Sequence, residues 1–277
     1  MILYGWDVIL FEYADVSSVF RIKSLNTAFT TQIGERYHFV GERHDFWELV
    51  IVIDGEVGVT AGEKTSVFQK GDAILHYPME FHRVWYAENV PAEILIFSFS
   101  AENVPEVKNR QFVVPDLRVP INLLHKIQSV FTMDEGNVHA MCREELNCHI
   151  VLKELEIFLL ELLRGRGLAF AGTNSKSAEN YTRLVRCLTD QLGKDPSVEE
   201  IARLCNMSAV NAKQTFARYA GMGIRDYFNR LRVERAITML RDGCSVQETA
   251  AALAFSSPNY FCTAFKRITG RAPTAYK

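Results

Sequence analysis

Ser197-Val-Glu-Glu-Ile-Ala202 recurs 48 residues later as Ser245-Val-Gln-Glu-Thr-Ala250. In each copy a serine stands three residues ahead of a glutamate, the capping-box pattern that begins a helix. Each copy continues through serine, phenylalanine and glycine: Ser208, Phe216 and Gly221 in the first, Ser256, Phe265 and Gly270 in the second. The pattern predicts two short helices with a tight turn, a helix-turn-helix whose second helix can enter a DNA major groove.

The two predicted turns differ in one residue. Asn206 tolerates a left-handed backbone, whereas Ala254, at the matching place, is strained if its turn is left-handed. Ala202 and Ala250 are small and allow the two helices of each pair to approach closely. A helical hairpin used only for packing is the alternative interpretation, but a spaced duplicate with matching caps favours a pair of DNA readers.

Residues 180–277 resemble the DNA-binding domain of AraC-type bacterial transcription regulators. The resemblance is carried by Arg232, Ala236, Ala250, Phe255, Tyr260-Phe261, Phe265-Lys266, Gly270, Pro273 and Tyr276. Ala212, Ala217 and Ala254 depart from the family, which usually has Leu, Lys and Gly there. The resemblance implies an all-α domain with two helix-turn-helix subdomains, joined by a helix that we expect at about Ile224–Arg241, and double-stranded promoter DNA as the partner.

Family positions also imply the DNA-binding side chains. Val210, Lys213 and Gln214 match base-facing positions of the first reader, and their spacing places them on one helix face. The full expected set is Val210, Asn211, Lys213, Gln214 and Arg218, then Ser257, Asn259, Thr263, Lys266 and Arg267. Charge agrees, because residues 180–277 hold 15 Lys and Arg against 8 Asp and Glu, a net of +7, while the rest of the chain has a net of −9.

Residues 1–110 alternate short apolar runs with turns, which indicates a β-barrel or jelly roll. The expected strands are Phe46–Ile53, Glu56–Thr60, Ser66–Gln69, Ala73–His76 and Ile94–Phe99. Glu42-Arg-His44-Asp-Phe-Trp-Glu48, followed by Gly55, resembles the first cupin motif, and Gly71-Asp72, Pro78 and His82 resemble the second. AraC-type regulators often carry such a domain as an effector sensor, so the two resemblances reinforce each other.

The expected effector-binding residues are Glu42, His44, Phe46, Glu48, His82 and Tyr86. Residues 42, 44, 46 and 48 share one face if they form a strand. His44, Glu48 and His82 match three ligands of metal-binding cupins, but Glu42 stands where the first histidine is usual. A divalent cation, an organic effector and an internal polar network all fit this set. We expect a small organic effector, a sugar or an aromatic or organic acid, with no metal and no cofactor.

Two helices are expected at about 118–164, the first at about Pro120–Phe131 and the second at about Asn137–Arg164. Cys148, Leu152, Leu155, Leu159 and Leu162 repeat at coiled-coil spacing, which favours a homodimer seam over burial within a monomer. A Gly- and Ser-rich linker is expected at 165–179, between a sensor and dimerisation domain at 1–164 and the DNA-binding domain at 180–277.

The fold class expected is thus α+β multidomain, and the function is an effector-responsive, sequence-specific transcription regulator, not an enzyme. A metal-dependent cupin enzyme tethered to a DNA-binding domain is the alternative, and an architectural DNA-binding protein without an effector is a third class. RNA polymerase is a candidate partner. The N-terminus lacks the basic flank of a signal peptide, no apolar run reaches the roughly 20 residues that cross a bilayer, and the six cysteines show no zinc spacing. The expected location is therefore the cytoplasm.

Overall fold

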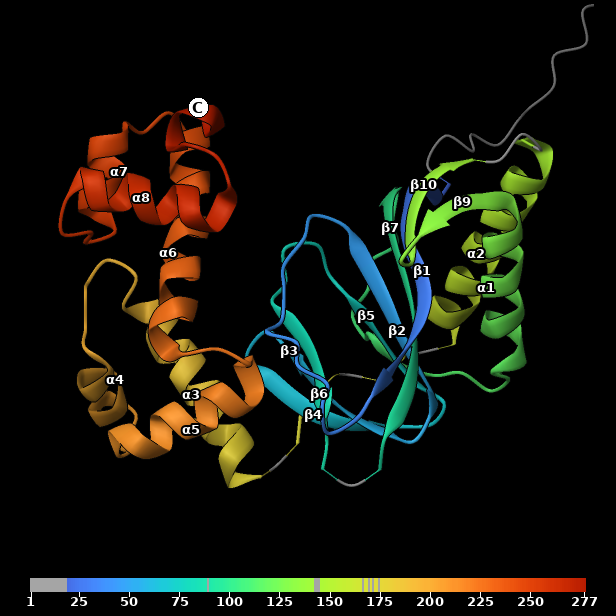
Figure 1. Cartoon of the computed structure of the whole chain (residues 1–277), viewed down its shortest axis with the longest axis horizontal. Coiled ribbons are helices and arrows are strands. Elements are labelled where there is room, and N and C mark those ends of the chain that lie inside the picture. The colour runs from blue at the N-terminus through green and yellow to red at the C-terminus, as the bar shows by residue number, and fades with distance from the viewer. Residues whose placement is uncertain are drawn as a thin grey trace, which may run out of the picture.

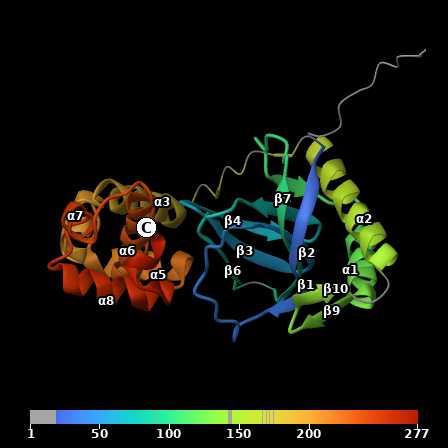
Figure 2. The ribbon, with the colours of Figure 1, turned by 90° about the horizontal axis from the view of Figure 1, so that it is seen from above.

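The computed structural model describes residues 19–88, 90–141, 145–165, 167–168, 170, 172–173 and 175–277. Four layers follow one another across the molecule (Figures 1 and 2): the helices α1 (Arg118–Val130) and α2 (Glu145–Arg164), a seven-stranded sheet, a three-stranded sheet, and a helical C-terminal domain. A sheet-rich N-terminal domain and a helical C-terminal domain agree with the expected fold class. No helix among the described residues is long and apolar enough to cross a membrane.

Both sheets are antiparallel. The larger sheet has the order β8 (Gln111–Val113), β5 (Asp72–His76), β2 (Trp47–Asp54), β7 (Ala92–Glu102), β1 (Arg21–Ile33), β10 (Asn137–Met141) and β9 (Phe131–Asp134). The smaller sheet has the order β4 (Lys64–Gln69), β3 (Glu56–Ala61) and β6 (His82–Tyr86), with Val59 opposite Val84. The expected strands within 46–99 are present, whereas β1 and β6 were not anticipated.

Side chains alternate across the larger sheet and so build two separate cores. Val50, Val52 and Ile94 pack with residues of the smaller sheet, in the space between the two sheets. Leu49 and Ile51, one residue out of phase, pack instead in the core that contains α1 and α2. This period of two is what a strand requires when both of its faces are covered.

The segment 137–141 is a strand, so the expectation that the second helix begins near Asn137 is wrong. Glu135 and Gly136 both have positive φ, 45° and 85°, and form the turn of the β9–β10 hairpin. Thr27 of β1 pairs with Asn137, which fixes the hairpin at the side of the larger sheet. Gly136 also lies against the Phe29 ring with no room for a Cβ atom, so a glycine is required there on two grounds.

The apolar repeat on α2 faces the protein's own sheet. Cys148, Leu155, Leu159 and Leu162 are buried in the core shared with α1 and β1, and Leu152 packs against that core. The proposal that these residues form a dimer seam is therefore wrong. The 3-4 spacing describes the buried stripe of an amphipathic helix as well as a coiled coil, and here the partner is the sheet.

The C-terminal domain consists of α3 (Lys176–Asp190), α4 (Val198–Leu204), α5 (Ala209–Ala220), α6 (Ile224–Arg241), α7 (Val246–Ala252), α8 (Pro258–Thr269) and the 3-10 helix η1 (Pro273–Tyr276). Both capping boxes are present, Ser197 with Glu200 and Ser245 with Glu248. The helix α3, capped by Ser175, begins inside the stretch 165–179 that was expected to be linker. A serine N-cap is a helix-start signal, and it outweighs the local Gly and Ser content.

The turn of each helix pair is left-handed, with φ of 54° at Asn206 and 51° at Ala254. Ala254 thus adopts the left-handed backbone for which strain was expected, because a Cβ atom crowds the following carbonyl in this conformation. Ala202 and Ala250 are buried between their helices, as their size suggested.

Candidate functional site

A cavity of about 380 Å³ lies between the two sheets, and we call it the inter-sheet cavity. Five of the six expected effector-binding residues line it: Glu42, His44, Phe46, Glu48 and His82. β2 begins only at Trp47, so the assumption that 42 to 48 form one strand is wrong. Glu42 joins the sheet through an isolated bridge to His82, with backbone hydrogen bonds of 2.9 and 3.0 Å.

The titratable side chains of the cavity converge on Glu48. His44 Nε2 lies 3.5 Å from one carboxylate oxygen of Glu48, and His82 Nε2 lies 3.3 Å from the other. Glu42 reaches within 3.9 Å of His82 Nε2. The Nδ1–H of His44 donates to the Phe46 carbonyl and the Nδ1–H of His82 donates to the Glu80 carbonyl, each at 3.0 Å. Both Nε2 atoms are therefore directed into the cavity.

Burial and mutual contact shift the pKa values of these groups. Burial by itself would raise the pKa of Glu48, but His44 and His82 outweigh it and hold this pKa well below its usual range. Burial and the charge of Glu48 raise the pKa of Glu42. Burial opposes protonation of His82, yet the contact with Glu48 raises its pKa above the usual value. The contact between the two side chains thus favours a protonated His82 beside an ionised Glu48.

Several residues that line the cavity were not predicted from the sequence. Thr27, Phe29 and Thr31 come from β1, Tyr37 and Phe39 from the chain after it, Ser98 from β7, and Glu135 and Asn137 from the β9–β10 hairpin. Burial and the nearby Glu42 raise the pKa of Tyr37 to about 12. No local pattern could have singled these residues out, because long-range strand pairing brings them to the cavity.

The other aromatic and histidine residues that were considered for effector binding do not line the inter-sheet cavity. Tyr86 is not among the residues that line the inter-sheet cavity, and it packs against the core between the sheets. Trp47 contacts the Tyr77 ring, and Trp85 contacts the C-terminal domain. His76 is fully buried and stacks on His82, with ring centroids 4.4 Å apart; burial and the charge of His82 lower its pKa to about 4.

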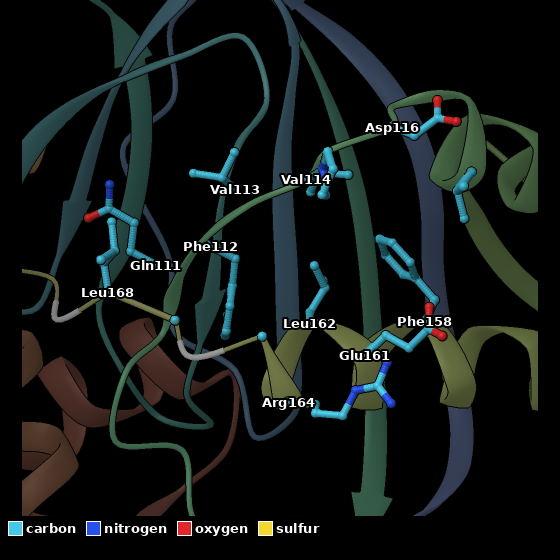
Figure 3. Close-up of a pocket in the computed structure, with 14 residues that line it drawn as sticks. Gln111, Phe112, Val113, Val114, Asp116, Phe158, Glu161, Leu162, Arg164 and Leu168 are labelled. Carbon is cyan, nitrogen blue, oxygen red and sulfur yellow. The ribbon is translucent and has the colours of Figure 1, made fainter.

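A larger groove of about 600 Å³ lies outside the sheets, between β8, the end of α2, and Gly165, Gly167 and Leu168 (Figure 3). Its walls are mainly apolar, with Phe112, Phe158 and Leu162 around it and the charged Glu161 and Arg164 on α2. The converging polar groups that fix a ligand's orientation are found in the inter-sheet cavity, which makes that cavity the better candidate site despite its smaller volume.

Strand β6 separates the inter-sheet cavity from the C-terminal domain. His82 and Val84 line the cavity, whereas Arg83 and Trp85 point the opposite way. Arg83 donates to the carbonyls of Phe39 at 2.6 Å and of Arg218 at 2.5 Å. Trp85 makes an edge contact with the Tyr219 ring at 5.5 Å between centroids. Because successive side chains of β6 point to opposite faces, this one strand contacts both the cavity and α5.

Residues 42–44 repeat this arrangement. Glu42 and His44 line the cavity, while Arg43 between them forms an ion pair with Glu234 and donates to the Tyr227 hydroxyl at 3.4 Å. Glu234 and Tyr227 both belong to α6, the helix that joins the two helix pairs.

Further contacts hold the two domains together. Thr60 donates to the Tyr219 carbonyl at 2.8 Å, and Thr182 donates to the Glu63 carbonyl at 2.6 Å. Glu63 also pairs with Arg186, which lowers the pKa of that carboxyl. The smaller sheet and the C-terminal domain therefore share a packed and hydrogen-bonded interface, and Phe81 and Trp85 belong to the same core as α3, α5 and α6.

The expected DNA-binding side chains are largely exposed. Val210, Asn211, Lys213 and Gln214 lie on the outer face of α5, while Asn259, Thr263, Lys266 and Arg267 lie on that of α8. Ser257 is the N-cap of α8 and accepts from the Tyr260 N–H. Arg218 differs from the others because it turns toward Glu88 of the N-terminal domain, at 3.5 Å.

Arg232 connects the two helix pairs inside the domain. This buried side chain donates to the Leu253 carbonyl at 2.8 Å, lies 3.8 Å above the centre of the Phe255 ring and reaches Asp195 at 3.3 Å. Asp195 precedes α4 and Phe255 follows α7, so one cation contacts both halves. This agrees with the bridging role that its family position implied.

Two family models match the chain in agreement with this architecture. The AraC-like ligand binding domain matches residues 26–137, and the helix-turn-helix domain matches residues 201–277. Both the sheet-rich domain and the helical domain are thus identified independently. Together the two matched regions span more than half of the chain.

Curated relatives include the uncharacterised HTH-type transcriptional regulator YijO of Escherichia coli, 32% identical over 106 residues, which is 38% of each chain. The HTH-type transcriptional activator RhaS of Klebsiella pneumoniae is 24% identical over 83% of this chain and 84% of its own. RhaR of Mannheimia succiniciproducens is 20% identical over 88% and 90%. Among solved structures, ToxT of Vibrio cholerae covers 93% of this chain and 96% of its own at 10% identity, with a TM-score of 0.37. The chain belongs to the AraC-type transcription regulators, with an AraC-like ligand-binding domain ahead of a helix-turn-helix DNA-binding domain.

Proposed function

We propose that a small molecule binds in the inter-sheet cavity and changes how the C-terminal domain binds promoter DNA. The observation that carries this proposal is the alternation at 42–44 and along β6, where neighbouring residues contact the cavity and the C-terminal domain in turn. A ligand that displaces Glu42 or His82 acts directly on the segments that hold Arg43 and Arg83. Such a ligand shifts DNA binding only as far as its affinity differs between the two states.

We propose this route in preference to one through α2. The helices α1 and α2 cover the far face of the larger sheet, on the side opposite the C-terminal domain (Figures 1 and 2). The first 18 residues, a further candidate for transmitting the effector signal, lie outside the described residues. The shortest physical connection from the cavity to α5 and α6 is the direct interface.

The ligand class follows from the walls of a cupin-type cavity. A volume of about 380 Å³ lies within the range of small-molecule sites. Phe29, Tyr37, Phe39 and Phe46 offer apolar and aromatic surface, while Thr27, Thr31 and Asn137 offer hydrogen bonds. A sugar or a small organic acid suits this mixture. We expect the protein to act in the cytoplasm, where promoter DNA and RNA polymerase are found.

We infer that α5 and α8 are both DNA readers. Each is the second helix of a capped pair with a left-handed turn, and each exposes polar side chains on its outer face. The connecting helix α6 has 18 residues, which is about 27 Å at 1.5 Å per residue. That length suits placement of two recognition helices in successive major grooves on one side of the duplex.

We also propose a homodimer, formed through the opposite face of α2 from the one expected. Leu146, Ile150, Ile157 and Leu160 are 79%, 56%, 56% and 37% exposed, and their spacing places them in one stripe. Apolar residues at such spacing on a solvent face mark a helix-pairing surface. Ile150→Asp with Ile157→Asp is expected to yield monomers by sedimentation, while Val113→Asp with Val119→Asp, at exposed apolar residues elsewhere, leaves the dimer intact.

The enzyme alternative has less support, because the named relatives are transcription regulators. The regulator proposal is tested with DNA selected by the full-length protein from a random pool and with thermal-shift hits from sugars and organic acids. A hit is expected to change DNA affinity in the unmodified protein. Arg43→Ala should bind the hit equally well but lose most of that change, and Arg36→Ala, at an exposed residue, should behave as the parent. An equal response in Arg43→Ala would contradict the direct route.

A further inference from the structure

The chain that joins α2 to α3 is attached to the N-terminal domain at three points. Leu168 exchanges two backbone hydrogen bonds with Gln111 of β8, at 2.6 and 3.2 Å. The Phe170 side chain is buried, and the Thr173 N–H donates to the Thr65 carbonyl of β4 at 2.6 Å. We call Leu168, Phe170 and Thr173 the strap. These residues are fixed to both sheets, because β8 belongs to the larger sheet and β4 to the smaller one.

Phe170 is the anchor of the strap. Its side chain is 5% exposed, belongs to the core between the two sheets and meets the Phe68 ring edge-on, with centroids 6.0 Å apart. Lys64 donates to the Phe170 carbonyl at 3.0 Å, and the Arg110 guanidinium lies 5.3 Å from the centre of the Phe170 ring. A buried aromatic ring contributes more than a backbone hydrogen bond near the surface, so the strap depends most on Phe170.

The strap determines how far the C-terminal domain can move. Ser175 is the N-cap of α3 and stands two residues after Thr173. An extended chain spans about 3.3–3.6 Å per residue, so α3 begins within about 7 Å of the attachment at β4. With the strap detached, the chain from Gly165 to Ser175 reaches up to about 33–36 Å. A longer tether lowers the effective concentration of the C-terminal domain at its interface with the smaller sheet.

A row of contacts connects the strap to the inter-sheet cavity. His82 lines the cavity and stacks on His76, with ring centroids 4.4 Å apart. His76 Nδ1 lies 3.5 Å from a carboxylate oxygen of Glu80, which forms an ion pair with Arg110. The Arg110 guanidinium then covers the Phe170 ring. The side chains of Glu80 and Arg110 are 14% and 11% exposed, so a shift of either one displaces its protein neighbours rather than water.

We propose that the strap is a second connection between the inter-sheet cavity and the C-terminal domain: an occupant that displaces His82 shifts Arg110 and so detaches Phe170. The direct interface positions α5 and α6, whereas the strap sets the distance over which the whole domain can move. The inference rests on the proposed ligand-responsive function, because an occupant of the cavity starts the shift. The attachment of the strap needs no ligand and is measured without one.

The test is hydrogen exchange of the full-length protein, followed by mass spectrometry on peptides that cover residues 165–175. The Leu168 and Thr173 amides donate to carbonyls of the sheets, so both should exchange at least about tenfold more slowly than amides of an unfolded chain. Phe170→Ala should raise both rates at least about tenfold, because the strap loses its anchor. Leu168→Ala is the matched control, since the Leu168 side chain is exposed and the bridge is made by its backbone. Thr173 should then exchange as in the parent.

The connection to the cavity is tested in the same way. Glu80→Gln removes the charge that pairs with Arg110, and His82→Ala removes the cavity end of the row of contacts. Each variant should raise the exchange rate of the Thr173 amide at least about threefold. Thr31→Ala, at a cavity residue of β1 outside this row, should leave that rate unchanged.

Two outcomes overturn the inference. Fast exchange of the strap amides in the parent shows that the strap is not attached, and unchanged rates in both Glu80→Gln and His82→Ala show that the cavity is not connected to it. Peptides of α2 report on the folding of each variant. If they also exchange faster in Phe170→Ala, Lys64→Met takes its place, because it removes only the donor to the Phe170 carbonyl and should still raise the strap rates. A thermal-shift hit that alters DNA affinity while the strap rates stay constant would leave the regulator proposal standing and refute the strap.

Discussion

The two helix pairs of the C-terminal domain share caps, turns and length, but they differ in what they pack against. The core of the first pair includes Phe81 and Trp85 of the N-terminal domain. The core of the second pair is built from residues between Val233 and Tyr276. A change at the smaller sheet therefore reaches α5 directly and reaches α8 through α6. The two helix pairs are alike in local structure, but they differ in how directly they contact the N-terminal domain and therefore the proposed effector site.

The largest effect is expected at the contact that distinguishes the first pair. Trp85 is buried against Tyr219 and donates to Thr60 at 3.1 Å. Trp85→Ala should lower the free energy of unfolding by about 3–5 kcal/mol, because a large cavity opens at the interface. Calorimetry should then show two transitions, one for each domain. Trp47→Ala, on the other side of the N-terminal domain, should leave the coupling of the domains intact; a single transition for Trp85→Ala would show that other contacts carry that coupling.

The link between the two pairs is the next target. Arg232→Ala should lower the free energy of unfolding by about 3 kcal/mol, since it removes a buried cation and leaves the Leu253 carbonyl without its donor. Denaturant titration measures this loss. Arg235→Ala is the matched control, because Arg235 is an exposed arginine on the same helix. Equal midpoints for the two variants would rule out a bridging role for Arg232.

The readers should also differ in base discrimination. Gln214 on α5 is long enough for a paired contact with adenine, while Asn259 and Thr263 on α8 are shorter. Gln214→Ala should cost about 1–3 kcal/mol of binding at one operator position, and Thr263→Ala less than about 1 kcal/mol. Competition assays with operator and random DNA measure both values. If Gln214→Ala loses the same affinity on both kinds of DNA, this residue contacts phosphate rather than a base.

The smallest effect concerns the turns. Ala254, at φ 51°, costs about 1–2 kcal/mol relative to a residue that adopts the left-handed backbone freely. A glycine in its place would remove this cost but would increase the conformational entropy of the unfolded chain, which offsets part of the gain. Ala254→Gly should therefore raise the free energy of unfolding by about 0.5–1 kcal/mol. Asn206→Gly should stay within about 0.5 kcal/mol, because asparagine tolerates this conformation. Thermal melting of both variants makes the comparison, and a destabilised Ala254→Gly would contradict the strain.

Local patterns predicted the C-terminal domain well. The capping boxes and the bounds of α6 were predicted from the sequence because caps and helical periodicity act over a few neighbouring positions. Five cavity residues were identified through the resemblance of two short segments to cupin motifs. The β9–β10 hairpin was missed because the five residues of strand after its glycine turn gave too little pattern to distinguish a strand from a helix.

The sequence by itself determined that two capped helix pairs follow a sheet-rich domain, because helix caps and strand alternation depend on residues that are neighbours in the sequence. It also marked the apolar stripe of α2, but only the tertiary structure decided that this stripe packs on the protein's own sheet. The same holds for the inter-sheet cavity, whose walls come from β1, β7 and the β9–β10 hairpin. Sequence spacing fixes which side chains share a face; what covers that face depends on free energies of packing between segments far apart in the chain.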